Sequence, residues 1–187
     1  ETGAGKSTLI RHLTGVYRPD QGEVQIDGEN VYENKAVKSK IAYIPDELFY
    51  FMQADTMEMK RFYEGIYPSF DGKLFYRMQE FFPNIDVKRN IRRLSKGMQK
   101  QVAFWLAICC KPDILILDEP TAVLTPQEID EVLMQLNAGD YLLLQNEIAN
   151  LTYLLRAAAR RGLRVVLNAS PISDELLNAD LSGVDWL

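Results

Sequence analysis

The 187-residue sequence has no apolar run that approaches the roughly 20 residues needed for a helix to span a membrane. It has only two cysteines, the adjacent Cys109 and Cys110, so a disulfide framework is excluded and a reducing compartment is indicated. Both cysteines lie in an apolar helical pattern, which predicts buried core thiols. The net charge of −5 at pH 7 argues against a general nucleic-acid binder.

A signal peptide is also missing, and together with the lack of a long apolar run this predicts a soluble protein that could dock on a membrane partner. The sequence starts at Glu1 rather than Met, and its last residues, Trp186 and Leu187, are typical of a strand, so we expect truncation at both ends. The composition, with 47% hydrophobic and 25% charged residues, argues against disorder and predicts one α/β domain with a buried core.

Helical and strand patterns alternate along the chain, which predicts an α/β fold with a mainly parallel sheet and helices on both faces. Helices are expected at 6–16, 55–67, 71–82, 95–111, 126–136, 147–161 and 173–178. Strands are expected at 23–27, 40–44, 114–117, 141–145 and 164–167. The aromatic-rich helices at 55–67 and 71–82 indicate an inserted helical subdomain that covers 48–111.

A glycine-rich segment at the start of the chain matches the second half of the G-x-x-x-x-G-K-[ST] phosphate loop. Its residues are Gly3, Ala4, Gly5, Lys6, Ser7 and Thr8. Backbone N–H groups of such a turn converge on phosphate oxygens, because no Cβ blocks the approach and the following helix adds its positive dipole end. Lys6 is predicted to bridge the β- and γ-phosphates of ATP, and Ser7 to offer its hydroxyl to Mg²⁺. The structural alternative is a glycine turn that only caps a helix.

A second motif is the apolar run 114–117 followed by Asp118, Glu119 and Pro120. Such a strand carries Asp118 out beside the phosphate loop, where its carboxylate can hold Mg²⁺ through water. Glu119 is then placed to polarise the attacking water and is the candidate catalytic residue. The structural alternative is a pair of acidic residues that closes a strand into a proline turn.

Between these motifs lies a segment that resembles the LSGGQ signature of ABC ATPases, Leu94-Ser95-Lys96-Gly97-Met98-Gln99. Lys96 and Met98 depart from the commonest form of that signature. Residues 1–135 thus resemble an ABC transporter ATP-binding subunit, which implies a phosphate-loop NTPase fold. The resemblance also implies a dimer in which this segment, at a helix N-terminus, reaches the γ-phosphate held by the opposite subunit. The implied contacts across the dimer are Ser95, Lys96, Gly97 and Gln99. The structural alternative is that Ser95 is only a good N-cap.

The resemblance further implies a transmembrane permease partner, and hence a position at the cytoplasmic face of the membrane. In relatives a glutamine usually follows the strand at 40–44 and couples the metal to the permease. Asp46 takes that place here and is a further candidate Mg²⁺ ligand. The aromatic-rich region from Phe49 onward occupies the part that docks the permease in relatives. We expect most of its aromatic side chains in the core and a few exposed near 49–53.

Two further features leave alternatives open. Six basic residues crowd around the signature, namely Lys88, Arg89, Arg92, Arg93, Lys96 and Lys100. A solvated helix face, or a rim that attracts nucleotide phosphates, explains these charges without a nucleic-acid ligand. The loop 121–126 resembles that of ATPases from sugar and nucleoside uptake systems, whereas residues 1–120 resemble the drug- or antibiotic-responsive exporter branch.

The resemblance changes in the last third of the chain. Residues 138–187 resemble the middle of a ribokinase-like sugar kinase, without that family's acidic metal motif, anion hole or catalytic aspartate. The simplest account is a chimeric chain, with an ABC core over 1–135 and a βαβ segment over 136–187. ABC relatives carry a switch histidine where this chain has Ser170. The only histidine, His12, lies in the first predicted helix and is expected to be a surface or packing residue.

Three functions follow from these residues. The first is ATP binding and hydrolysis as the nucleotide-binding subunit of an ABC transporter, with Mg²⁺ and a second subunit. The second is an ATP-dependent dimerisation module that does not hydrolyse ATP, which the missing switch histidine favours. The third is a fragment of a sugar kinase, which only the tail favours.

Overall fold

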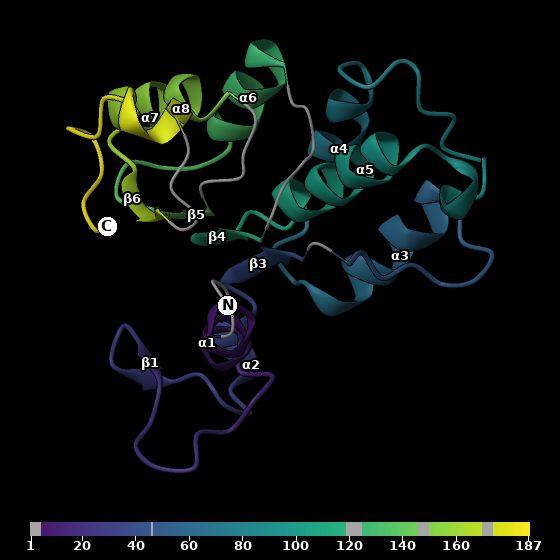
Figure 1. Cartoon of the computed structure of the whole chain (residues 1–187). Helices are drawn as coiled ribbons and strands as arrows, with labels where there is room; N and C mark the ends of the chain where they lie inside the picture. Colours follow the sequence, from purple (N-terminus) through teal and green to yellow (C-terminus); the bar gives the residue numbers. More distant parts are fainter. Residues whose placement is uncertain (1–4, 46, 119–124, 146–149, 170–173) are drawn as a thin grey trace.

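The computed structural model describes residues 5–45, 47–118, 125–145, 150–169 and 174–187 (Figure 1). Within these ranges the elements follow in the order α1 (Lys6–Leu13), β1 (Gln25–Ile26), β2 (Glu29–Asn30), α2 (Lys35–Lys38), β3 (Ile41–Ile44), α3 (Thr56–Ile66), α4 (Gly72–Gln79), a 3₁₀ turn (Ile91–Arg93), α5 (Lys96–Cys109), β4 (Ile114–Leu117), α6 (Pro126–Leu133), β5 (Tyr141–Gln145), α7 (Leu151–Arg160), β6 (Arg164–Asn168) and α8 (Asp174–Leu177). Helices and strands alternate, so the predicted α/β class is confirmed.

Strands β3, β4, β5 and β6 form a parallel sheet in that order. Tyr43 of β3 lies opposite Ile116 of β4, which in turn lies opposite Leu143 of β5. The apolar runs at 114–117 and 141–145 are strands with the predicted bounds. The strands predicted at 40–44 and 164–167 each differ from the observed strand by one residue. Short apolar runs between helices therefore predicted the parallel sheet well.

The two faces of the sheet pack against different helices (Figure 1). On one face, Leu115 and Leu142 join the main core, which also includes side chains of α5, α6 and α7. On the other face, Ile10 of α1 packs against Ile41 and Ile116. Because successive strand residues point to opposite faces, each strand contributes to both cores. Helices on both faces confirm the prediction, and the contact of Ile10 places α1 against β3 and β4.

The aromatic side chains of the inserted helical region extend the main core around α5. Trp105 stacks on Phe75 with ring centroids 4.4 Å apart, and on Phe82 at 5.8 Å. Its indole Nε1 donates a 2.9 Å hydrogen bond to the carbonyl of Phe75, so the buried polar group is satisfied. The helix α5 is 14 residues long, and no helix in the described ranges is both long and apolar enough to cross a bilayer.

Most helix starts coincide with side-chain caps that the sequence contains. Asp55, Asp71, Ser95 and Thr125 each accept a hydrogen bond from a backbone N–H in the first turn of the helix that follows. Such caps satisfy donors that the helix itself cannot pair. The starts of the helices predicted at 55–67, 71–82, 95–111 and 126–136 therefore lie within one residue of the structure.

The N-terminal region differs from the prediction. The first helix ends at Leu13 rather than at residue 16, because Gly15 adopts a φ of +65° and the N–H groups of Val16 and Tyr17 both donate to the carbonyl of Arg11. The strand predicted at 23–27 is only the two-residue β1, which forms an antiparallel hairpin with β2. Neither β2 nor α2 was predicted. Elements of two to four residues are too short to give a periodic pattern.

The segments on either side of residue 135 form one structural unit. Strand β4 pairs directly with β5, so the sheet continues across the expected boundary. Leu133 and Leu144, one on each side, belong to the same buried cluster. A division at residue 135 therefore remains a prediction about ancestry, and the four-stranded parallel sheet is continuous across it.

Candidate functional site

Asp118 lies at the carboxyl end of β4 and is only 8% exposed. Its backbone N–H donates to the carbonyl of Ile44 at 3.0 Å, which continues the pairing of β4 with β3. Its Oδ2 accepts a 2.9 Å hydrogen bond from the phenol of Tyr43. The structure therefore brings the predicted metal-binding carboxylate to a sheet end and fixes both its backbone and its side chain to one neighbouring strand.

The predicted phosphate loop leads directly into α1. Gly5 is the N-cap residue and no described side chain caps the helix, in contrast to α3, α4, α5 and α6. Ser7 and Thr8 lie in the first turn and are exposed. Lys6 is the first helical residue, and its side chain, like Gly3 and Ala4, lies outside the described part. An uncapped helix start leaves backbone N–H groups that can bind an anion.

Gly5 and Gly97 occupy places where the fold itself does not require glycine. A Cβ added to either residue would meet no atom within 4 Å, and neither residue has a positive φ. By contrast, a Cβ on Gly15 would lie 2.6 Å from Lys38 Cε. Packing against the described residues therefore does not require glycine at either position, and both backbones are open to close approach of a ligand or partner.

The signature segment forms the N-terminus of α5. Ser95 is the N-cap, and its hydroxyl accepts a 3.2 Å hydrogen bond from the N–H of Met98. Lys96 and Gly97 are exposed in the first turn. The amide of Gln99 instead donates to the carbonyl of Leu94 at 2.9 Å, so this side chain is engaged within its own chain. Ser95 therefore caps α5, as the structural alternative predicted. Its contact with a nucleotide across a dimer stays a prediction.

Besides Gly3 and Ala4, several predicted positions lie outside the described part of the chain, namely Asp46, Glu119, residues 121–124 of the loop and Ser170. The geometry of the candidate catalytic carboxylate and of the Asp46 position therefore stays a prediction. Within the described ranges, no group of three His, Cys, Asp or Glu side chains is arranged to hold a metal.

Two tyrosines contact the predicted site and were not predicted from the sequence. Tyr43 binds Asp118, as described above. Tyr50 donates a 2.5 Å hydrogen bond from its phenol to the backbone carbonyl of Gln99, and the guanidinium of Arg92 donates to the carbonyl of Tyr50 at 3.0 Å. Both partners are far away in the sequence, so periodicity and motif spacing contain no signal for them.

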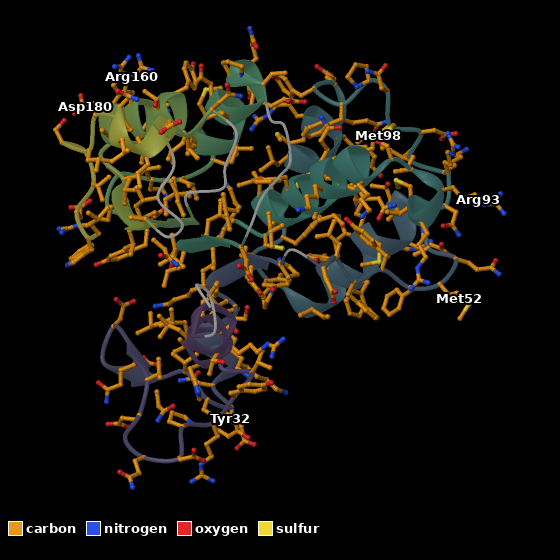
Figure 2. The ribbon with its side chains drawn as sticks, in the orientation of Figure 1. Tyr32, Met52, Arg93, Met98, Arg160 and Asp180 are labelled. Atoms are coloured by element: carbon orange, nitrogen blue, oxygen red, sulfur yellow. The ribbon has the colours of Figure 1, made fainter. Side chains whose placement is uncertain are left out.

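Exposed aromatic residues gather beyond the end of β3 and on α3. Phe49 and Phe51 have ring centroids 5.6 Å apart, and Phe51 and Phe62 4.8 Å apart. Phe49 is 70% exposed and Met52 is 75% exposed, and Figure 2 shows Met52 and Arg93 projecting from the same end of the molecule. We call Phe49, Phe51, Met52 and Phe62 the aromatic patch. Exposure near 49–53, with Tyr50 and Phe75 buried in the core, confirms part of the prediction, but Phe62 and Tyr76 are exposed outside that range.

The basic residues around the signature divide into two groups. Lys100 is buried in α5 with 8% exposure, so it does not belong to the solvated face that was predicted. The others are exposed, namely Lys88, Arg89, Arg92, Arg93 and Lys96. Arg93 and Lys96 flank Ser95, so positive charge surrounds the N-terminus of α5. This arrangement suits a rim that attracts phosphate groups.

The remaining titratable groups that the sequence singled out serve the fold. Cys109 and Cys110 are buried and unpaired, and burial raises the pKa of the Cys110 thiol to about 12. His12 is half-buried, with its Nδ1 3.3 Å from the carbonyl of Tyr17 and its ring packed edge-on against the Tyr17 ring. The predictions of core thiols and of a packing histidine are therefore confirmed.

A cavity of about 460 Å³ lies between the β1–β2 hairpin and the sheet face that α1 partly covers. Its lining includes Leu13, Asp27, Lys40, Tyr141 and Val166. None of the predicted site residues that the structure describes lines it. We therefore assign the nucleotide site from the motif residues and not from this cavity.

Comparison with known proteins gives the family. The family model described as ABC transporter matches residues 1–122. A guanosine import ATP-binding protein of Bacillus subtilis (strain 168) is 36% identical over 146 residues, which cover 71% of this chain and 28% of that protein. A ribose import ATP-binding protein of Lacticaseibacillus paracasei is 32% identical over 143 residues, which cover 71% of this chain and 29% of that protein. The chain thus spans less than a third of the length of these relatives.

Solved structures share the fold. An ATP-binding subunit of an ABC transporter superposes with a TM-score of 0.64 at 24% identity and covers 89% of this chain and 71% of its own. A bacterial Atm1-family ABC exporter with ATP bound gives a TM-score of 0.59 at 18% identity over 91% of this chain and 28% of its own. Both matches cover more of the chain than residues 1–135 contain, so the shared fold extends into the segment after residue 135. Because the family model spans the phosphate loop, the signature and the strand that ends at Asp118, the chain belongs to the ABC transporter family.

Proposed function

We propose that the chain is the nucleotide-binding part of an ABC transporter and binds ATP between the N-terminus of α1 and the carboxyl end of β4. The observation that carries this proposal is an uncapped helix start combined with a buried carboxylate. No described side chain caps α1 at Gly5, so its first N–H groups can donate to phosphate oxygens. Asp118, 8% exposed, provides a fixed negative charge at the end of β4. The helix and the strand are joined through the contact of Ile10 with Ile116.

The donor set suits Mg²⁺. This ion prefers oxygen ligands, keeps several waters, and is usually bound by one or two carboxylates together with substrate phosphates. Asp118 and Ser7 offer a carboxylate and a hydroxyl, and the described residues include no larger cluster of acidic or histidine ligands. We propose that these two residues hold the ion, with Asp46 as a further candidate. When bound, Mg²⁺ would neutralise charge on the β- and γ-phosphates.

The other residues have roles that follow from their charge. The Lys6 ammonium stabilises negative charge on the β- and γ-phosphates, together with the N–H groups of α1. The Glu119 carboxylate accepts a proton from a water molecule, whose oxygen bonds in line to the γ-phosphorus while the bond from that phosphorus to the leaving oxygen of ADP breaks. Ser95 and Gly97 of a second subunit complete the site from the other side, because their helix N-terminus favours an anion.

The partners are proposed from the surface of the molecule. The aromatic patch exposes contiguous rings beside the signature segment, and such surfaces typically bind other proteins. We propose that it docks a transmembrane permease, which would place the chain at the cytoplasmic face of the membrane. A second nucleotide-binding subunit, identical or related, would pair with the signature helix. The names of the relatives favour an uptake system for a nucleoside or sugar, as the loop 121–126 also does.

An alternative is ATP-dependent dimerisation without turnover. His12, the only histidine of the chain, is tied to Tyr17 at the end of its own helix. It therefore has no evident role in the turnover of ATP. The origin of residues 138–187 in a sugar kinase also remains a proposal. Strands β5 and β6 with α7 form a parallel unit, an architecture that suits both families and does not distinguish them.

The test is the affinity of the chain for Mg-ATP, measured by calorimetry on the wild type, Lys6→Ala and Lys73→Ala. Lys73 is a matched control, because it is likewise a lysine in the first turn of a helix. Its side chain is exposed, and that helix has a side-chain cap. We expect Lys6→Ala to abolish binding and Lys73→Ala to preserve it. Equal affinity of all three proteins would contradict the proposal.

Turnover is tested separately by the release of ADP. Slow hydrolysis that Glu119→Gln abolishes would support the ATPase. Dimerisation by ATP that is insensitive to Glu119→Gln, without ADP release, would support the non-hydrolysing alternative. Release of ADP that requires an added sugar would support a sugar kinase instead.

A further inference from the structure

Two hydrogen bonds join Asp118 to strand β3. The carbonyl of Ile44 accepts from the backbone of Asp118, and the phenol of Tyr43 donates to its Oδ2. We infer that Tyr43 is a positioning residue, which orients the Asp118 carboxylate toward the Mg²⁺ of bound ATP. The inference rests on the proposed function and adds a residue that neither the phosphate loop, the acidic strand end nor the signature contains.

The register of the sheet explains why Tyr43 can reach Asp118. Tyr43 lies opposite Ile116, and Asp118 follows two residues later on the adjacent strand. Residues two apart in a strand lie on the same face, about 6.6 Å from each other along the strand. A tyrosine side chain that leans along the strand spans this distance with its ring and hydroxyl. A shorter side chain at position 43 would not place a donor at the strand end.

The ring of Tyr43 is held by its neighbours. It packs against the cluster formed by Ile10, Ile41 and Ile116, which joins α1 to strands β3 and β4. Movement of the phenol therefore requires rearrangement of an apolar contact that also positions α1. The same cluster therefore packs against both α1, the helix that follows the phosphate loop, and Tyr43, the hydrogen-bond donor to Asp118.

A phenol is chemically suited to this position. It donates one hydrogen bond and carries no charge at neutral pH, so it adds no positive charge beside the carboxylate. A lysine or arginine would instead neutralise Asp118 and compete with a cation. A carboxylate has about four acceptor sites, so one phenol bond is compatible with metal binding. Because Asp118 is nearly buried, this bond is stronger than it would be in water.

A purely structural role predicts a different outcome. In that case Tyr43 would only satisfy a buried carboxylate, and its loss would lower the melting temperature without changing how ATP binding depends on Mg²⁺. A positioning role predicts that the Mg²⁺ dependence shifts even at temperatures where the variant is fully folded. The two roles are therefore separated by a binding measurement.

The experiment uses the full 187-residue chain with Tyr43→Phe, which removes only the hydroxyl. ATP affinity is measured by competition with a fluorescent nucleotide at increasing Mg²⁺ and in EDTA. We expect the Mg²⁺ concentration for half-maximal enhancement to rise about tenfold, as for other residues that orient a metal ligand, with ATP affinity in EDTA unchanged. Tyr141→Phe is the matched control, because Tyr141 lies on the same face of the sheet, 38% exposed and stacked on Trp186.

A double-mutant cycle with Asp118→Asn completes the test. If Tyr43 acts through Asp118, adding Tyr43→Phe to Asp118→Asn causes no further shift in the Mg²⁺ dependence. A Tyr43→Phe protein that matches the wild type, while Asp118→Asn loses the Mg²⁺ response, would overturn the inference and leave the proposed function intact. Equal loss of affinity with and without Mg²⁺ would also overturn it. A folded wild type that binds no ATP would overturn both.

Discussion

The phenol of Tyr50 and the backbone carbonyl of Gln99 are joined by a 2.5 Å hydrogen bond, which ties the segment after β3 to the first turn of α5. Burial raises the pKa of Tyr50, so the phenol remains a donor at physiological pH. Arg92 adds a second link at 3.0 Å to the carbonyl of Tyr50. The aromatic patch on either side of Tyr50 is therefore attached directly to the signature helix.

We expect Tyr50→Phe to lower the free energy of unfolding by about 1–2 kcal/mol, because a carbonyl in the first turn of α5 loses its phenol partner. Tyr76→Phe is the control, since Tyr76 is 53% exposed and contributes its ring to a cation–π contact with Lys60 that phenylalanine retains. Urea unfolding of both variants measures the difference. A loss no larger than that of the control would show that the Tyr50 bond contributes nothing to stability.

Substitutions at Ser95 can separate its role as a helix cap from its proposed contact with the γ-phosphate held by the opposite subunit. Ser95→Ala removes the acceptor for the N–H of Met98 and should cost about 1 kcal/mol. Ser95→Asp keeps a capping side chain but adds negative charge where the γ-phosphate of the opposite subunit would lie. We expect it to preserve stability in urea and to prevent ATP-driven dimerisation in sedimentation experiments. Dimerisation of Ser95→Asp at wild-type ATP concentrations would contradict the proposed contact.

The sequence predicted the parts of the fold that depend on neighbouring residues. The apolar run at 114–117 marks β4 because an uninterrupted β-branched and leucine segment suits a buried parallel strand. Asp71 and Ser95 mark helix starts because their side chains pair with N–H groups two or three residues later. The motif residues Lys6 and Asp118 could be named for the same reason, since their spacing to adjacent elements is local.

The missed features depend on contacts that are distant in sequence. Tyr43 and Asp118 are 75 positions apart, and Tyr50 and Gln99 are 49 apart. Their pairing follows from the register of β3 against β4 and from the packing of α5, which no periodic pattern encodes. The end of α1 at Leu13 likewise depends on the turn at Gly15. The helical pattern of the sequence continues up to residue 16, so it did not predict this turn.

Two threonines should respond in opposite directions to the same substitution. Thr56 is fully buried at the start of α3 and its hydroxyl has no hydrogen-bond partner, so Thr56→Val should stabilise the protein by about 1 kcal/mol. The hydroxyl of Thr125 accepts from the N–H of Glu128 and donates to its carboxylate, so Thr125→Val should destabilise by about 1 kcal/mol. Thermal and urea unfolding of the two variants measure whether each one gains or loses stability. A destabilised Thr56→Val protein would indicate that this hydroxyl is satisfied after all.

Asp71 should contribute stability that depends on pH. The N–H of Leu74, followed by weaker contributions that include Lys111, lowers the pKa of Asp71 below its ordinary value of 3.8. A lowered pKa in the folded state gives stability that is present above the ordinary value and is lost as the pH falls through the lowered one. Asp71→Asn still caps α4 but carries no charge, so we expect it to be less stable than the wild type near pH 7, and the difference to shrink below about pH 4. Urea midpoints at both pH values, with the exposed Asp20→Asn as control, measure this. An unchanged acid dependence would refute the assignment.

The buried cysteines offer a probe of global opening. Cys109 is 0% and Cys110 1% exposed, and burial raises the pKa of both thiols, that of Cys110 to about 12. Because the thiolate is the reactive form, we expect neither to react with a thiol reagent in the native chain and both to react in guanidinium. In low urea, labelling should follow the unfolding equilibrium, since α5 lies in the main core. Ser182→Cys supplies an exposed thiol that reacts at once. Rapid labelling of Cys109 or Cys110 without denaturant would mean that α5 opens locally and that the signature segment is not held by a stable core.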